Sequence, residues 1–244
     1  MSNQCNQFIF RRVWAIMTVI LGTLVIGCII LFVSVVDKNG NKCHRLAQLW
    51  GRLIGLAAGI DVILEGLENI DPEQSYVYAS NHQSALDIIV LQGYLPVQFR
   101  WLAKKELFDI PCFGRFMAST GYIPIDRGNK KSAMQSLELA AKKVQQGTSV
   151  IIFPEGTRSL DGQLLPFKPG GFLLAIKSKR PIVPVGISGS ARVLPGKTLC
   201  LRPGRIKVAL GRPIETAGLS YKQRYEVADR VKAAILEKID KNYL

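Results

Sequence analysis

Histidine is scarce in this sequence of 244 residues, which contains only His44 and His82. Cysteine occurs five times, at positions 5, 28, 43, 112 and 200, and no two cysteines form a CxxC pair. Protein zinc sites take their ligands mainly from histidine and cysteine at short, recurring spacings. The sequence therefore predicts no metal site.

Two kinds of glycine-rich nucleotide loop are also missing. The segment 153–171, FPEGTRSLDGQLLPFKPGG, is rich in glycine and basic residues, but it matches neither G-x-x-x-x-G-K-[ST] nor G-x-G-x-x-G. Those two patterns place backbone N–H groups around the phosphates of nucleotides. Because the segment matches neither pattern, there is little support for reading it as a nucleotide-binding loop.

Acidic residues are too few to balance the basic ones. Lys and Arg total 32 against 18 Asp and Glu, which gives a formal net charge of +14. Such an excess favours anionic partners, namely nucleic acid, an anionic bilayer surface or phosphorylated substrates. Since hydrophobic residues make up 48% of the chain, it is expected to fold around a sizeable core.

One long hydrophobic run favours the membrane among these partners. Residues 13–36 contain no charge, and as a helix they would be about 36 Å long, enough to cross a hydrocarbon core of roughly 30 Å. A cleaved signal peptide is the alternative, but the run is longer than a typical signal core and lacks a clear small-x-small cleavage site. Residues 46–60 form a weaker, amphipathic stretch that would lie in the interface. We therefore expect residues 1–60 to be a helical membrane anchor, either transmembrane or a two-helix monotopic unit.

Residues 61–244 alternate between strand-like and helix-like segments. This alternation predicts an α/β layer architecture, in which ligands bind where the strands end. Pro124 suggests that its strand lies at an edge or a terminus of the sheet. The expected strands are 75–80, 99–103, 121–125, 148–153, 182–188 and 205–211, and the expected helices are 85–95, 130–147, 171–179 and 221–243.

The stretch NHQSALD, residues 81–87, places a carboxylate five residues after a histidine. On one regular helix the two side chains would point roughly 140° apart. However, SALD reads as a capping box with Ser84 as N-cap, which leaves His82 in the turn before the helix, where it can reach Asp87. The pair then suits a general base whose tautomer is fixed by a carboxylate. Taken alone, the pattern is more often a capped turn beside a polar histidine.

Two further segments carry charges next to strand ends. In 153–171, Glu155 and Arg158 follow a strand. Arg158 would clamp a phosphate, and Glu155 would orient Arg158 or bind a hydroxyl. A surface turn with a salt bridge explains the same residues equally well. In GYIPIDRGNKK, residues 121–131, Arg127 and the two lysines at the start of the next helix form another plausible anion site. The apolar run from 107 to 117 is read as core packing, with a lipid-facing surface or acyl channel as the alternative.

In combination, these motifs closely resemble the 1-acylglycerol-3-phosphate acyltransferase family. N-H-x₄-D, K-x-E-L, G-Y-I-P-I-D-R, F-P-E-G-T-R-S and I-V-P-V-G-I follow one another within residues 75–190, in the order usual for the family. The hydrophobic N-terminal anchor is also typical. The resemblance implies a glycerolipid acyltransferase-type layered domain over residues 61–244, with a central mixed sheet flanked by helices.

The resemblance also implies an activity. An acyl group would move from a thioester of acyl-carrier protein or coenzyme A to the sn-2 hydroxyl of lysophosphatidic acid, yielding phosphatidic acid. His82 would be the general base and Asp87 would orient it, whereas Ser84 is not expected to be a nucleophile because no G-x-S-x-G elbow surrounds it. The implied substrate-binding residues are Lys104, Lys105, Arg127, Glu155, Gly156, Thr157 and Arg158.

The expected partners follow from this activity: the lipid bilayer, lysophosphatidic acid and the thioester carrier, with no nucleic acid and no cofactor beyond the acyl thioester. The expected location is a bacterial-type inner (cytoplasmic) membrane, with the catalytic domain on its cytoplasmic face, because basic residues follow the first helix. Three alternatives stay open. The acceptor could be glycerol-3-phosphate or another lysolipid such as a lyso-ornithine lipid, or the chain could bind lipid without catalysis. The oligomeric state stays open as well.

Overall fold

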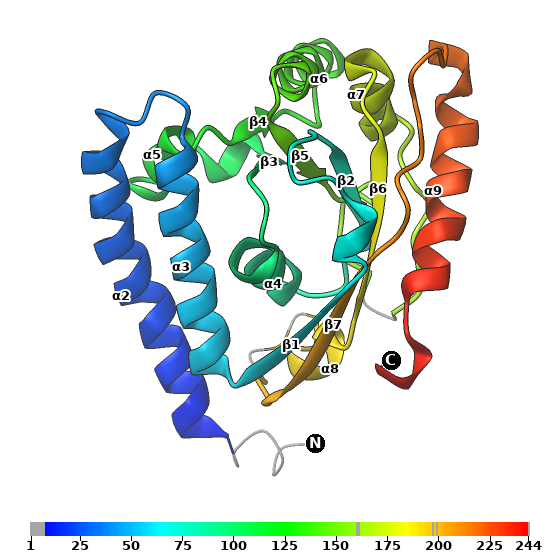
Figure 1. Ribbon diagram of the computed structural model, residues 1–244. Coiled ribbons are helices and arrows are strands. Elements are labelled where there is room, and N and C mark those ends of the chain that lie inside the picture. Colours follow the sequence, from blue (N-terminus) through cyan, green and yellow to red (C-terminus); the bar gives the residue numbers. More distant parts are fainter. Residues whose placement is uncertain (1–7, 160–161, 197, 199, 244) are drawn as a thin grey trace.

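The computed structural model describes residues 8–159, 162–196, 198 and 200–243 and is organised around a seven-stranded mixed sheet (Figure 1). The order across the sheet is β1-β7-β6-β2-β5-β3-β4. Strands β2 to β6 are parallel, β7 is antiparallel to β6, and β1 is parallel to β7. The strands are β1 (Ile60–Glu65), β2 (Val77–Ser80), β3 (Phe99–Lys104), β4 (Ile123–Ile125), β5 (Ser149–Ile152), β6 (Ile182–Ser188) and β7 (Gly204–Leu210).

Helices cover both faces of this sheet, which confirms the predicted α/β class. In β2, Tyr78 packs into the core on the side of α3 and α4, whereas Val77 and Ala79 pack into the core on the side of α6, α7 and α9. This alternation is the two-residue period of a strand buried on both faces. The longer helices are α2 (Ile9–Ser34), α3 (Asn41–Ala58), α4 (Leu86–Tyr94), α5 (Phe113–Ser119), α6 (Lys130–Gln145), α7 (Gly170–Ser178) and α9 (Arg224–Lys238). The short ones are η1 (Leu67–Asn69), η2 (Lys105–Leu107), α8 (Ser190–Val193), η3 (Tyr221–Gln223) and η4 (Lys241–Tyr243).

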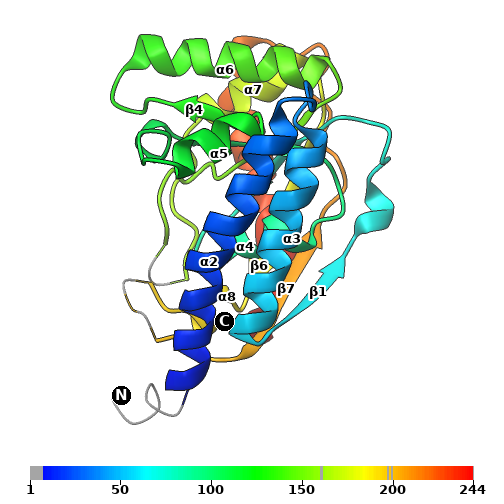
Figure 2. The same ribbon diagram turned by 90° about the vertical axis from the view of Figure 1, so that its left-hand side faces the viewer.

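The N-terminal helices α2 and α3 form an antiparallel pair beside the sheet (Figure 2). Within the described residues, α2 is the one helix that is long and apolar enough to cross a membrane, judged by length and composition. Much of its surface is uncovered, and the large exposed hydrophobic side chains of α2 and α3 include Phe10, Val13, Trp14, Ile20, Leu21, Leu24, Val25, Phe32, Leu49, Leu53 and Leu56. These side chains give the pair an extensive apolar surface.

Helix α3 joins this pair to the rest of the protein through a close crossing with α4. A Cβ atom on Gly51 would lie 2.7 Å from the backbone nitrogen of Gly93, and one on Gly93 would lie 2.6 Å from the backbone nitrogen of Arg52. At the same place the Arg52 Nε–H donates to the Gly93 carbonyl over 2.7 Å. The amide of Gln48 donates to the carbonyls of Leu95 and Val97, just beyond α4. The absence of side chains at the two glycines thus permits backbone-to-backbone contact between the helices.

Three elements differ from the sequence-based expectation. Strand β1 was not predicted, since residues up to 60 were assigned to a helix; Gly59, at φ 70°, ends α3 at Ala58 and releases the chain into the strand. The second helix begins at Asn41 rather than 46, and α5 was not assigned as a helix. In the apolar run, Phe116 and Met117 are buried as expected. Leu107 and Ile110 of the same run are exposed.

The predicted edge strand is confirmed. Strand β4, which contains Pro124, lies at the end of the sheet and, among the described strands, pairs only with β3. Proline has no N–H group for a second partner strand, so an edge position suits it. At the opposite end, β1 is the other edge, where β7 is its one partner within the described part of the chain.

We predict that Gly51→Ala lowers the melting temperature of the detergent-solubilised protein. Alanine is favoured over glycine in a helix by about 1 kcal/mol, but the added methyl group would press on the α4 backbone, and overpacking typically costs 1–3 kcal/mol. Differential scanning fluorimetry would measure the change. Gly170→Ala is the matched control because no heavy atom lies within 4 Å of its added Cβ. A Gly51→Ala variant that melts above the wild type would contradict the close crossing.

Candidate active site

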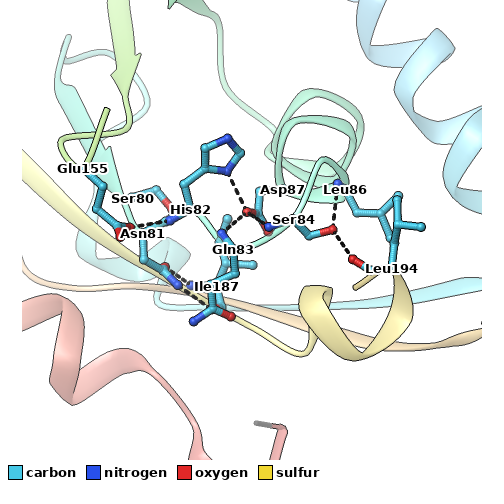
Figure 3. Close-up of polar contacts among 10 residues, drawn as sticks. All are labelled: Ser80, Asn81, His82, Gln83, Ser84, Leu86, Asp87, Glu155, Ile187 and Leu194. Atoms are coloured by element: carbon cyan, nitrogen blue, oxygen red, sulfur yellow. Dashed lines mark hydrogen bonds and ion pairs between the residues drawn. The ribbon is translucent and has the colours of Figure 1, made fainter. Parts of the chain in front are cut away.

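His82 lies two residues beyond the end of β2, with its ring directed at the first turn of α4 (Figure 3). The Nδ1 atom of His82 is 2.8 Å from the Oδ2 atom of Asp87. Asp87 is fully buried, and the His82 side chain retains 12% of its exposure. The contact that the NHQSALD spacing allows is therefore formed, because the turn before α4 folds the histidine back over the helix.

The start of α4 resembles the predicted capping box but is displaced by one residue. The helix begins at Leu86 with Ala85 at the N-cap, rather than Ser84. Ser84 still donates its backbone N–H to Asp87 Oδ2 over 2.8 Å, which is one half of a capping box. The Ser84 hydroxyl accepts the Leu86 N–H at 3.3 Å and donates to the Leu194 carbonyl at 2.8 Å.

The carboxylate of Asp87 fixes the protonation pattern of the imidazole. Its Oδ2 atom also accepts the backbone N–H groups of Gln83 and Ser84, at 2.7 and 2.8 Å. A carboxylate that receives several donors acts as an acceptor, so His82 Nδ1 carries the proton in this contact. The Nε2 atom of the neutral ring then has its lone pair free. This is the arrangement of a general base with an orienting carboxylate.

Aromatic side chains fix the plane of the ring. Phe153 stacks on His82 with ring centroids 4.0 Å apart and planes inclined by 13°, and Trp101 stacks behind Phe153 at 5.5 Å. The indole N–H of Trp101 and the hydroxyl of Tyr122 both donate to Gln92 Oε1, each over 2.8 Å. Phe153 was not among the residues predicted for the site. Its position at the start of FPEGTRS, directly after a buried strand, was the available signal.

The backbone of His82 is held by the loop that follows β5. Its N–H donates to Glu155 Oε1 over 2.7 Å, and its carbonyl accepts the N–H of Ser159 over 2.8 Å. The other carboxylate oxygen of Glu155 accepts the Leu165 N–H at 2.9 Å. Burial raises the pKa of the Glu155 carboxyl, and the hydrogen bonds from Leu165 and His82 offset part of that effect.

This placement differs from the role expected for Glu155. The residue was expected to orient Arg158 or to bind a substrate hydroxyl, but it is only 2% exposed and both oxygens accept backbone N–H groups. Strands β2 and β5 are neighbours, so the turns that follow them meet at one edge of the sheet. Glu155 therefore ties those two turns together.

Asn81 provides a second tie, from β2 to its other neighbour. The Asn81 amide donates to the Ile187 carbonyl at 2.9 Å, and its oxygen accepts the Ile187 N–H at 2.7 Å. The side chain is completely buried. It thus continues the pairing of β2 with β6 beyond the end of the strand. Asn81 is part of the NHQSALD motif, but its place in the motif does not indicate this role.

Positive charge gathers around the loop at residues 155–158. Arg127 donates to the carbonyl of Gly156. Gly156 has φ 72°, and the Lys168 ammonium lies within 2.9 Å of the position that a Cβ on Gly156 would take. Thr157 and Arg158 are exposed. Arg127 and the 155–158 loop, predicted from separate motifs, are therefore brought together. Lys168 is a further cation there, which sequence reasoning did not single out.

The two remaining predicted cations lie at the end of β3. Lys105 pairs with Asp126 at 3.6 Å, beside Arg127, whereas Lys104 pairs with Glu106 at 3.1 Å. All four side chains are at least partly exposed, so these pairs contribute little to stability. Lys105 is thus linked to the neighbour of Arg127, and Lys104 contacts a carboxylate on its own segment.

Comparison with known proteins gives consistent matches. The family model described as Acyltransferase matches residues 61–188. The chain is 37% identical over 186 residues to the chloroplastic 1-acyl-sn-glycerol-3-phosphate acyltransferase BAT2 of Brassica napus, covering 75% of this chain and 54% of that protein. It is 32% identical over 201 residues to the 1-acyl-sn-glycerol-3-phosphate acyltransferase of Helicobacter pylori, covering 82% of this chain and 81% of that one. The chain spans about half the length of several curated relatives that it matches.

A solved structure is also similar. The crystal structure of the 1-acyl-sn-glycerophosphate (LPA) acyltransferase PlsC from Thermotoga maritima aligns with a TM-score of 0.78 and 26% sequence identity. The alignment covers 96% of this chain and 97% of that one. The similarity therefore includes the N-terminal helices as well as most of the sheet.

We predict that Glu155→Gln lowers the melting temperature. Glutamine offers one acceptor oxygen where the carboxylate offers two, so its NH₂ group would face a backbone N–H of His82 or Leu165. Losing a charge-assisted hydrogen bond costs about 1.5–3 kcal/mol, and each kcal/mol corresponds to roughly 2–4 °C in a protein of this size. Glu237→Gln, an exposed change on α9, is the control that should melt with the wild type. Equal melting temperatures for both variants would show that Glu155 does not tie the turns.

Proposed function

The chain belongs to the acyltransferase family, and on that premise we propose that it transfers a fatty acyl group from a thioester to the sn-2 hydroxyl of lysophosphatidic acid, forming phosphatidic acid. The observation that carries this proposal is the His82–Asp87 contact of 2.8 Å. It lies at the edge of the sheet formed by the C-terminal ends of the parallel strands, where Arg127 and Arg158 also follow their strands. A base and a cationic loop at one edge are what acylation of a phosphorylated alcohol requires. The names of the matched relatives support the choice of acceptor.

The first step is removal of the acceptor proton. The Nε2 atom of His82 takes the proton of the substrate hydroxyl as its oxygen attacks the thioester carbonyl carbon. The resulting imidazolium lies against the Asp87 carboxylate, which stabilises the new positive charge. Phe153 and Asp87 together hold the ring, so little reorientation accompanies the proton transfer.

The second step expels the thiol. The tetrahedral intermediate collapses with cleavage of its carbon–sulfur bond, and the imidazolium returns its proton to the departing thiolate. His82 is thereby neutral again, and one ester and one thiol have replaced one alcohol and one thioester. The acyl thioester already carries an activated carbonyl, so the proposed steps need no further cofactor. The carrier is either acyl-carrier protein or coenzyme A.

Ser84 has no part as a nucleophile in this scheme. Its hydroxyl is fully buried and bonded to the Leu194 carbonyl and the Leu86 N–H. It also lies on the capping side of Asp87 rather than against the histidine ring (Figure 3). The acyl group therefore passes directly from donor to acceptor without a covalent enzyme intermediate.

The cations around residues 155–158 would receive the acceptor phosphate. Arg127, Arg158 and Lys168 provide positive charge, and the exposed Thr157 hydroxyl provides a hydrogen-bonding group. Guanidinium groups suit phosphate because they donate two parallel hydrogen bonds. We assign Lys105 to the outer part of this site and Lys104 to a more peripheral place, since Lys104 pairs within its own segment. Gly156 positions the loop through its positive φ.

We also propose that α2 lies in one leaflet of the bilayer instead of crossing it. A Cβ on Gly27 would lie 2.2 Å from the ring of Phe116, so α5 touches α2 in its C-terminal half, and α3 packs along it. If α2 crossed the membrane, α3 would enter the hydrocarbon together with the exposed Arg52 in its C-terminal half. That burial of unpaired charge is costly. Residues 1–60 would then be a monotopic anchor on the cytoplasmic face of a bacterial-type inner membrane, with residues 61–244 facing the cytoplasm.

We predict that His82→Ala abolishes measurable acylation of labelled lysophosphatidic acid and that Asp87→Asn reduces kcat. General base catalysis contributes typically 10²–10⁴-fold, which sets the scale of the loss. Purified variants would be assayed with acyl-carrier protein and coenzyme A thioesters, using melting temperature to confirm folding. Full activity of a folded His82→Ala protein would refute the mechanism.

The same assay separates the alternative functions. A panel of glycerol-3-phosphate, lysophosphatidic acid and lyso-ornithine lipid would identify the acceptor. If the wild type acylated a different member of this panel, the acceptor assignment would be wrong while the base mechanism stood. If it acylated none while binding lysophosphatidic acid, the protein would be a lipid-binding member of the family.

We predict that Arg158→Gln lowers kcat/KM for lysophosphatidic acid by about 10- to 100-fold, mainly by raising the acceptor KM. A hydrogen bond to a charged group contributes about 1.5–3 kcal/mol, and 1.4 kcal/mol is a factor of ten. Arg230→Gln removes an exposed arginine from α9 and serves as the control for the change in net charge. Unchanged acceptor kinetics in Arg158→Gln would remove this residue from the phosphate site.

A further inference from the structure

A second cationic site lies beside the short helix α8 and the start of β7, and its lining includes none of residues 155–158. It is a pocket of about 600 Å³ whose lining includes Arg192, Arg202, Arg205, Asn242 and Tyr243. Nothing in the proposed handling of the acceptor uses these residues. The site therefore requires an explanation of its own.

The charges of this pocket are only partly balanced. Arg205 pairs with Asp61 at 2.9 Å. Arg192 donates to the backbone carbonyl of Asn242 at 3.2 Å, and the Nε atom of Arg202 is buried without a hydrogen-bond partner. Among the residues that the structure describes, no carboxylate forms a salt bridge with Arg192 or Arg202. Two guanidinium groups without a counter-charge in a concave site favour an anionic ligand.

One backbone segment contacts both the pocket and the turn that contains His82. The Val193 carbonyl accepts the backbone N–H of Arg202 at 2.8 Å, and the next carbonyl, that of Leu194, accepts the Ser84 hydroxyl. Asn81, the residue before the histidine, bonds to Ile187 at the end of β6. The segment 187–194 thus contacts the His82 turn and also lines the pocket.

The sheet order places the two cationic sites on opposite sides of the histidine. Strand β2, which leads to His82, lies between β5 and β6. The 155–158 loop follows β5, whereas the pocket follows β6 and precedes β7. A two-substrate transfer needs two binding regions that converge on the base, and the acceptor phosphate already occupies the first in the proposed function.

We propose that the Arg192–Arg202 pocket binds the phosphate-bearing nucleotide end of the acyl donor, namely the adenosine 3′-phosphate 5′-diphosphate of a coenzyme A thioester. This inference rests on the proposed acyl transfer. The volume falls in the range of pockets for small ligands, 300–1,000 Å³, and the ring of Tyr243 offers a face for a nucleobase. A concave pocket lined by arginines suits such a ligand better than it suits the convex surface of a carrier protein.

Direct binding tests the proposal independently of catalysis. Free coenzyme A would be titrated calorimetrically into the purified full chain in detergent, in the His82→Ala background so that no turnover occurs. Adding Arg192→Gln and Arg202→Gln together is expected to raise the Kd at least tenfold. Adding Arg230→Gln, the exposed charge control on α9, is expected to leave it unchanged. Pantetheine, which lacks the nucleotide, is expected to bind weakly and equally to all three proteins.

Kinetics with acyl-coenzyme A and acyl-carrier protein distinguish the proposed ligand of the pocket from other anionic ligands. With His82 intact, the double arginine variant should show a raised KM for acyl-coenzyme A and an unchanged KM for acyl-carrier protein. A raised KM for acyl-carrier protein alone would instead assign the pocket to an acidic protein. Reduced binding to vesicles of anionic phospholipid, with unchanged coenzyme A affinity, would assign it to lipid headgroups.

Two further results would also overturn the inference. One is equal coenzyme A affinity in all the proteins. The other is a wild-type enzyme that uses only acyl-carrier protein, which would leave the proposed acyl transfer intact. By contrast, coenzyme A binding with no acylation of any lysolipid would refute the proposed function and not the nucleotide site.

Discussion

The carboxylate of Asp87 is the acceptor on which the arrangement of the site depends. One of its oxygens accepts hydrogen bonds from the His82 ring and from the backbone N–H groups of Gln83 and Ser84, all within 2.8 Å. The same group therefore shapes the turn, begins the helix and orients the imidazole of His82, the proposed base. These three roles are inseparable because they depend on the same oxygen of a fully buried carboxylate. Loss of the carboxylate would therefore change the turn and also the orientation of the His82 ring.

Parallel strands provide the second constraint. Strand β2 has β5 on one side and β6 on the other, and a buried side chain extends each pairing beyond the strand ends: Glu155 on the β5 side and Asn81 on the β6 side. His82 is held between these two ties. The two cationic regions follow the same division, since one belongs to the loop after β5 and the other to the segment after β6. The topology thus separates the proposed acceptor and donor sides around His82, the proposed base.

Much of the fold was predictable because its elements carry strong local patterns. The buried strand at 149–152 and the amphipathic helix at 130–145 were expected within a few residues, and Pro124 indicated an edge strand correctly. Strand β1 was missed because it follows an apolar helix without a polar break, and only the positive φ of Gly59 separates the two. At the site, the spacing of His82 and Asp87 allowed their contact, whereas the role expected for Glu155 differed from its actual contacts. A carboxylate beside an arginine in the sequence does not reveal that backbone N–H groups occupy both of its oxygens.

The sequence by itself determined the long apolar helix, the α/β class, the family motifs and the histidine that we propose as the base. These follow from composition, periodicity and short-range spacing, which local chemistry controls. Only the tertiary structure decided what lies beside what: Phe153 on the face of the imidazole, Arg127 on the 155–158 loop, and α3 against α4 at a pair of glycines. Those contacts join segments far apart in the chain. They depend on strand order and helix packing, which no local pattern encodes.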